Sequence, residues 1–171
     1  DGIGEIAYRY DGYIFDLWGV VHNGVKALPG AIDVMQRLRA TGNRIAFLSN
    51  APRRSMAVAD QLSELQIAPD HYDVIMSSGE EVWSHLSERT DPWYHELGRK
   101  CLHIGARRDK GMFEGLDLVL TENPAEAEFV VNTGTYGDGD SIVSYENLLG
   151  AIHALGLPMI CANPDLVVMR G

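Results

Sequence analysis

The sequence predicts an α/β fold built on a parallel sheet, and two apolar segments with a helical segment between them lead to that prediction. Residues 13–16 and 44–49 are rich in β-branched and aromatic side chains, as buried strands are. Residues 31–40 between them repeat apolar side chains with the period of a helix. A strand–helix–strand unit of this kind is right-handed and its strands are parallel, so their carboxyl ends meet at one edge of the sheet.

The helix expected at residues 31–40 is bounded by glycine on both sides. Ile32, Met35 and Leu38 recur at three-residue steps and would share one helical face. Gly30 precedes the pattern and Gly42 follows it, as is common at helix ends. This helix is therefore the crossover that joins the two strands.

The alternation of strand and helix continues along the chain. A helix is predicted from Ser55 to about residue 65, a short strand at 74–76, and another helix from Ser78. Elements expected beyond this point are strands at 100–104, 118–120, 129–132 and 159–161 and a helix at 145–154.

Two polar residues end the first two strands and form the candidate site. Asp16 ends one apolar run and Ser49 ends the other. A carboxylate at this edge is expensive to bury without a partner, which favours a metal-binding or reactive role. Capping of the turn that follows is an equal alternative. A carboxylate nucleophile beside a hydroxyl and backbone N–H groups is suited to handling a phosphoryl group.

The order of these segments resembles the haloacid dehalogenase (HAD) superfamily. Residues 16–20, Asp-Leu-Trp-Gly-Val, are similar to its motif I, and residues 48–50, Leu-Ser-Asn, to its motif II. The motif spacing and residues 162–165, Ala-Asn-Pro-Asp, resemble its NagD-like branch of small-metabolite phosphatases. The resemblance implies a Rossmann-like parallel-sheet core over residues 1–79 and an inserted α/β cap domain over residues 80–171. It also implies that the chain stops before the family's motifs III and IV.

The resemblance further implies roles for individual residues. Asp16 would be the catalytic nucleophile that forms an aspartyl-phosphate, and catalytic Ser49 would hold the phosphoryl oxygens. Mg²⁺ would be bound by the Asp16 carboxylate and the backbone carbonyl of Trp18. The substrate would be a small phosphorylated metabolite. The residues expected to bind it are Asn50, Arg53, Asn163 and Asp165. For Arg53 and the adjacent Arg54, a solvated charge pair at a helix entry is the alternative.

Trp18 departs from the family pattern and leaves three functions open. Family phosphatases carry a second aspartate there, which protonates the leaving group, whereas an indole exchanges no proton near neutral pH. The leading interpretation is a Mg²⁺-dependent phosphatase. One alternative is a dehalogenase-like enzyme, because family dehalogenases place an aromatic residue here. The other is a domain that has lost catalysis and only binds a metabolite or partner. If another group supplies the proton, His22 is the first candidate, although a structural hydrogen bond is the more common role of a loop histidine.

Composition indicates a cytoplasmic enzyme and disfavours nucleic-acid and membrane partners. Apolar residues make up 46% of the chain, and 24 acidic against 14 basic residues give a formal charge of −10. No apolar run is long enough to span a membrane, and the start has no signal-peptide pattern. Cys101 and Cys161 lie in apolar runs and are expected to be buried, reduced thiols. The oligomeric state is left open, a homo-oligomer included.

Overall fold

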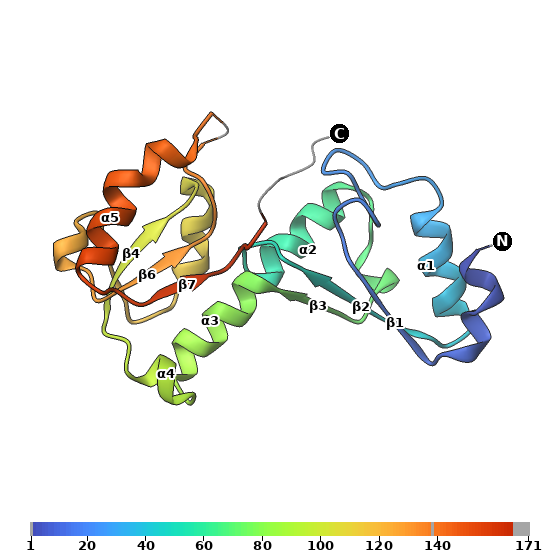
Figure 1. Cartoon of the computed structure of the whole chain (residues 1–171). Coiled ribbons are helices and arrows are strands. Elements are labelled where there is room, and N and C mark those ends of the chain that lie inside the picture. The colour runs from blue at the N-terminus through green and yellow to red at the C-terminus, as the bar shows by residue number, and fades with distance from the viewer. Residues whose placement is uncertain (1, 138, 166–171) are drawn as a thin grey trace. The chain divides into compact units, whose positions relative to one another are not determined.

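The computed structural model describes residues 2–137 and 139–165, which form two compact units (Figure 1). The first unit comprises residues 2–49, 55–77 and Asp165, and the second comprises residues 50–54, 78–137 and 139–164. The five residues 50–54 thus pack with the second unit, although the first unit surrounds them in sequence. The predicted division into a core and a cap stays a prediction.

A three-stranded parallel sheet forms the centre of the first unit. Its strands are β1 (Gly12–Phe15), β2 (Arg44–Ser49) and β3 (Val74–Ser77), in the order β1-β2-β3. The helix α1 (Ala31–Ala40) joins β1 to β2, and α2 (Ser55–Glu64) joins β2 to β3. Both strand pairs are parallel, which confirms the predicted arrangement.

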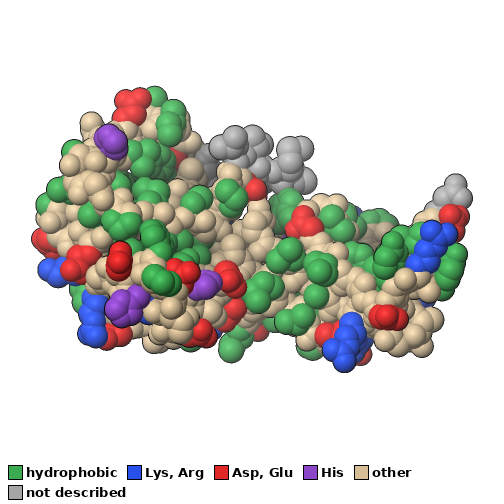
Figure 2. All heavy atoms as spheres, turned by 60° about the horizontal axis from the view of Figure 1, so that its bottom comes forward, with side chains coloured by type: hydrophobic (Ala, Val, Ile, Leu, Met, Phe, Trp, Pro, Cys, Tyr) green, Lys and Arg blue, Asp and Glu red, His purple; other side chains and the backbone are tan. Residues whose placement is uncertain are grey.

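One face of this sheet is buried and the other is exposed. Phe47 and Ile45 in β2 are fully buried, whereas Leu48 is 55% exposed. In β3, Ile75 is buried and Val74 is 50% exposed. Two right-handed crossovers that step in the same direction place their helices on the same face, which leaves the opposite face of the described unit open. Hydrophobic side chains are accordingly visible on the surface of this unit in Figure 2.

The second unit contains a four-stranded sheet in which all neighbouring strands are parallel. Its strands are β4 (Lys100–Ile104), β5 (Val119–Thr121), β6 (Phe129–Asn132) and β7 (Met159–Cys161), in the order β5-β4-β6-β7. Each strand lies within one residue of its predicted bounds, as does the helix α5 (Glu146–Ala154).

Helices cover both faces of the second sheet and make it a three-layer structure. On one face, α3 (Ser78–Glu88) and a 3₁₀ helix (Arg107–Phe113) contribute to a buried apolar cluster with Phe129. On the opposite face, Ile152 of α5 packs in a cluster with Val130 of β6. Successive residues of a strand point to opposite faces, so Phe129 and Val130 serve different clusters. The short helix α4 (Pro92–His95) lies between α3 and β4 in the chain.

The helices of the described residues are short. α3, with 11 residues, is the longest of those that the structure describes, and spanning a bilayer takes about 20. In the described part of the chain, no helix is long and apolar enough to cross a membrane.

The two cysteines have different environments, which corrects the expectation that both are buried. Cys101 in β4 is fully buried, whereas Cys161, the last residue of β7, is exposed, and both are free thiols. β4 is a central strand, whereas β7 lies at the edge of its sheet, where less protein covers its side chains. Burial raises the pKa of the Cys101 thiol to about 12.

We expect iodoacetamide to alkylate Cys161 and not Cys101 in the folded protein at about pH 8, because only the thiolate is nucleophilic. Cys101 stays protonated well above that pH and is also shielded from reagent. Peptide mapping by mass spectrometry should find one adduct, on Cys161, and a second only after denaturation. A Cys161→Ser variant is the control and should take up no adduct while folded. Rapid modification of Cys101 in the native protein would contradict the burial described for it.

Candidate active site

Asp16 and Ser49 come together at the carboxyl edge of the first sheet. Asp16 directly follows β1, and Ser49 is the last residue of β2. The register pairs Phe15 with Phe47 and Ser49 with Ser77, the last residue of β3. Because all three strands are parallel, these polar residues end their strands at the same edge, where open α/β sheets bind ligands.

The Asp16 carboxylate is exposed and only half engaged. Its Oδ1 accepts a hydrogen bond from the backbone N–H of Leu17 at 2.7 Å, and Oδ2 has no partner among the described residues. The N–H groups of Val21 and His22 in the following turn donate to the Leu17 carbonyl, at 2.9 and 3.1 Å, rather than to Asp16. Asp16 therefore does not cap this turn, and its second carboxylate oxygen faces solvent or a ligand.

The loop after Asp16 is held by its own backbone and by two buried side chains. Leu17 and Val21 are 2% and 3% exposed and anchor the loop in the first unit. Gly19 N–H donates to the His22 carbonyl at 2.8 Å, and Leu28 N–H donates to the Val21 carbonyl at 2.8 Å. The loop thus folds back on itself beside the end of β1.

Trp18, His22 and Gly24 pack against one another within this loop. His22 is 3% exposed, and its Nδ1 accepts a hydrogen bond from Gly24 N–H at 3.0 Å, so that its own proton, when the ring is neutral, is on Nε2. The edge of one ring meets the face of the other, with the Trp18 and His22 ring centroids 5.7 Å apart. Gly24 has φ of +84°, and a Cβ there would overlap the Trp18 indole. His22 accordingly has the structural role that is usual for a loop histidine.

The residues that the resemblance assigns to substrate binding are divided between the units. Asp165 is exposed and belongs to the first unit, whereas Asn50, Arg53 and Asn163 belong to the second. Burial lowers the pKa of Arg53, and the nearby Asp109 carboxylate opposes that shift. An arginine remains charged near neutral pH in either case. Substrate binding by these four residues stays a prediction.

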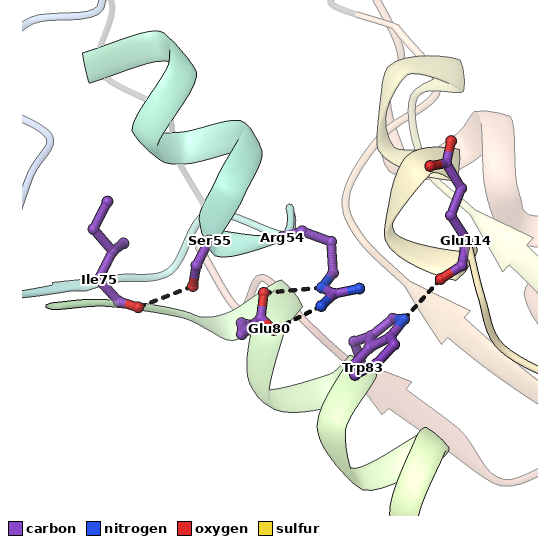
Figure 3. A network of polar contacts seen from close by, with 6 residues as sticks. All are labelled: Arg54, Ser55, Ile75, Glu80, Trp83 and Glu114. Carbon is purple, nitrogen blue, oxygen red and sulfur yellow. Dashed lines mark hydrogen bonds and ion pairs between the residues drawn. The ribbon is translucent and has the colours of Figure 1, made fainter. Parts of the chain in front are cut away.

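Arg54 has a structural role inside the second unit (Figure 3). Its Nε and Nη2 donate to the two carboxylate oxygens of Glu80 at 2.9 and 2.8 Å, and its Cζ lies 3.6 Å from the Trp83 ring centroid. The Trp83 indole N–H in turn donates to the Glu114 carbonyl at 2.8 Å. A bidentate ion pair and a cation–π contact hold the guanidinium in place. Arg54 thus forms a part-buried ion pair with Glu80, which differs from the solvated charge pair given as the alternative.

The donor atoms around Asp16 suit a hard divalent cation such as Mg²⁺. The carboxylate is exposed, and the backbone carbonyl of Trp18 is a second oxygen donor two residues along. Mg²⁺ keeps several waters and is often held by one or two carboxylates together with substrate phosphate oxygens. In the part of the chain that the structure describes, no three His, Cys, Asp or Glu side chains are grouped so as to hold a metal. These donors fit a largely hydrated Mg²⁺ rather than an ion enclosed by protein.

The sequence analysis did not identify two residues that lie beside the candidate site. Ser77 is fully buried at the end of β3 and is paired with Ser49. The signal for it was present, because a serine ends the third apolar strand just as Ser49 ends the second. No pattern in the sequence pointed to Gly24, because its contact with Trp18 depends on how the loop folds back.

Comparison with known proteins identifies the family. A family model described as haloacid dehalogenase-like hydrolase matches residues 13–119, more than half of the chain. The chain therefore belongs to the haloacid dehalogenase-like hydrolases.

Three known proteins illustrate the relationship. A crystal structure of a haloacid dehalogenase-like hydrolase from Brucella suis 1330 is 38% identical, with a TM-score of 0.88, over 100% of this chain and 62% of that one. NagD from E. coli K-12 has the same fold at 20% identity, with a TM-score of 0.62, over 94% of this chain and 59% of that one. The 4-nitrophenylphosphatase of Schizosaccharomyces pombe is 39% identical over 51 residues, which are 30% of this chain and 17% of that protein. The chain thus spans less than two thirds of the length of these proteins.

We expect Gly24→Ala to lower the free energy of unfolding by about 2–4 kcal/mol, because a left-handed residue and an overpacked contact are both unfavourable. The new Cβ would lie 2.7 Å from Cζ3 of Trp18, and closer still to Cη2. Urea unfolding measures the loss.

The matched control for this prediction is Gly30→Ala. Gly30 has φ of +82°, but a Cβ there meets no atom within 4 Å, so only the backbone strain of about 1–2 kcal/mol should appear. Equal losses in the two variants would contradict the tight contact between Gly24 and Trp18.

Proposed function

We propose that this chain carries the nucleophile of a Mg²⁺-dependent phosphatase, which acts on a small phosphorylated metabolite in the cytoplasm through an aspartyl-phosphate at Asp16. The Asp16 carboxylate is the observation that supports this function. It is exposed at the carboxyl edge of a parallel sheet, and its Oδ2 has no hydrogen-bond partner among the described residues. A carboxylate in this position is a competent nucleophile for a covalent route.

In the first step, Oδ2 of Asp16 attacks phosphorus while the bond from phosphorus to the ester oxygen breaks. The Leu17 N–H holds Oδ1 at 2.7 Å, which fixes the carboxylate and leaves Oδ2 for the attack. The Ser49 hydroxyl, at the same sheet edge, would donate to a phosphoryl oxygen and favour the charge that develops there. The leaving oxygen departs with the electron pair of the broken bond.

In the second step, water attacks phosphorus and the bond between phosphorus and Oδ2 breaks, which releases inorganic phosphate and restores the carboxylate. The proton that water loses balances the proton that the leaving oxygen takes up. Asp16 and the Trp18 carbonyl would hold Mg²⁺, which neutralises charge on the phosphoryl oxygens when it is bound.

Trp18 determines which leaving groups this route would favour. Its side chain is 39% exposed and has no proton to give near neutral pH. The nearby His22 ring is buried and uses Nδ1 as an acceptor within the loop. A leaving group that departs as a stable anion therefore suits this site better than one that must be protonated.

We expect Asp16→Asn to lower the hydrolysis of 4-nitrophenyl phosphate by more than about 10³-fold, because the amide cannot form the covalent intermediate. Stability should change by less than about 0.5 kcal/mol, since the side chain is exposed. Initial rates with and without Mg²⁺ and urea unfolding are the measurements. Asp11→Asn, another exposed carboxylate just before β1, is the control and should keep the wild-type rate. Full activity of Asp16→Asn would refute the assignment.

We expect Trp18→Asp to raise kcat/KM for alkyl and sugar phosphates by about 10²–10⁴-fold, because it restores a general acid. The rate with 4-nitrophenyl phosphate, whose phenolate needs little protonation, should change far less. Trp18→Phe keeps an aromatic ring in the loop without adding an acid and should produce no such gain. If the wild type already hydrolysed alkyl phosphates as fast as aryl phosphates, another group would supply the proton.

The same assays separate the two alternative functions, both of which Trp18 favours. Turnover of chloroacetate without phosphatase activity would identify a dehalogenase-like enzyme, because a halide leaves without a proton. Binding of phosphorylated metabolites with no turnover in any assay would identify a domain that has lost catalysis.

A further inference from the structure

The second unit contains a cavity of about 790 Å³ at the carboxyl edge of its parallel sheet. Its lining includes Gly105, Arg107 and Lys110, which follow β4, Glu122, which follows β5, and Tyr136, which follows β6. A cavity of this size suits a small organic ligand. All of these residues belong to the second unit, whereas Asp16 belongs to the first.

The strand order explains why a hollow forms at this place. In the order β5-β4-β6-β7, the chain leaves β4 for β5 on one side and later returns to β6 on the other side of β4. The segment after β4 leads to the 3₁₀ helix of Arg107–Phe113 on one face, and the segment after β6 leads to α5 on the opposite face. Parallel sheets bind ligands in the crevice between two such diverging connections.

A buried polar group holds the two diverging segments together beside the cavity. Nε2 of His103 lies 2.8 Å from Oγ1 of Thr133, and Thr133 donates to Oδ2 of Asp109 at 3.2 Å. Burial, with a smaller contribution from Lys110, lowers the pKa of His103 to about 4, so this ring is neutral at physiological pH. Gly105 admits no Cβ, which would overlap Thr133. The geometry beside the cavity is therefore fixed without a positive charge on the histidine.

Two basic side chains and one acidic side chain, Glu122, line the cavity, in a chain whose formal charge is −10. Arg107 and Lys110 are exposed, and no ion pair or hydrogen bond of either side chain is found among the described residues. By contrast, Arg54 is paired with Glu80. Unpaired guanidinium and ammonium groups at the mouth of a cavity favour a phosphate or similar dianion.

Tyr136 gives the cavity a flat wall with a fixed orientation. Its ring is 51% exposed and is stacked on Tyr145, with ring centroids 5.4 Å apart and planes 23° from parallel. Its backbone N–H donates to the Tyr145 hydroxyl at 2.7 Å, and that hydroxyl donates to Asp140 at 2.6 Å. Leu120, which is 39% exposed, also lines the cavity. An aromatic group of a ligand would find a preformed surface here.

We propose that this cavity is a binding site for a small aromatic phosphate, whose phosphate contacts Arg107 and Lys110 and whose ring lies against Tyr136. This proposal does not depend on the chain being a phosphatase.

Phenylphosphonate, which has no hydrolysable ester, is the probe for this site. It is titrated into the purified protein in the presence of EDTA and followed by two-dimensional NMR of the backbone amides. We expect a Kd below about 1 mM and shifts at residues 105–110, 121–122 and 136. The same shifts should appear in the Asp16→Asn variant, so a failure of the proposed catalytic role would leave this result unchanged.

The double variant Arg107→Gln/Lys110→Gln should weaken phenylphosphonate binding about tenfold or more, because both charge-assisted contacts are lost. The matched control is Arg99→Gln/Lys100→Gln, which removes two positive charges at the amino end of the same strand and should change Kd less than about twofold. Tyr136→Ala should weaken phenylphosphonate more than inorganic phosphate.

Three results would overturn the proposal. They are shifts confined to residues 16–24, an absence of shifts throughout the titration, and equal weakening by the two double variants. The first would mean that the probe binds only near Asp16. The last would mean that the overall charge, rather than a built site, attracts the anion.

Discussion

The parallel pairing of β1, β2 and β3 is the constraint on which the candidate active site depends. The register aligns Phe15 with Phe47 and Ser49 with Ser77, which fixes the edge at which Asp16 leaves β1. Burial maintains that register, because a slip of one residue would turn the fully buried Phe47 out of the core. The polar side chains of the site are thus positioned by the packing of apolar side chains one or two residues before them in the strands.

In the loop after Asp16, one residue, Trp18, matters both for packing and for the proposed chemistry. Trp18 fills the space over Gly24 and makes an edge-to-face contact with His22, and it also occupies the position where the resemblance to the family leads one to expect an acid. The indole packs within the loop, and it offers no proton near neutral pH at this position. Two constraints favour glycine at position 24: its φ is +84°, and any side chain there would compete with the indole for the same space.

Both units are organised by the same rule, that parallel sheets present their ligand sites at the carboxyl edge. In the first unit this edge carries the exposed carboxylate of Asp16, and in the second it carries a cavity with Arg107 and Lys110. The formal charge of −10 argues against a nucleic-acid partner but says nothing about a local site. Arg107 and Lys110, which form no ion pair among the described residues, place positive charge at this cavity in spite of the negative charge of the whole chain.

The sequence by itself determined the strands, the helices α1, α2, α3 and α5 and the parallel arrangement of the first sheet, because these depend on periodicity and on turn residues close by in the chain. It also identified Asp16 and Ser49, since each ends an apolar strand. Only the tertiary structure decided that Cys161 is exposed and that Arg54 binds Glu80 and stacks on an indole. Those outcomes depend on contacts between residues distant in sequence and on which strand lies at the edge of a sheet. No local pattern encodes either property, because both arise only when separate elements pack together.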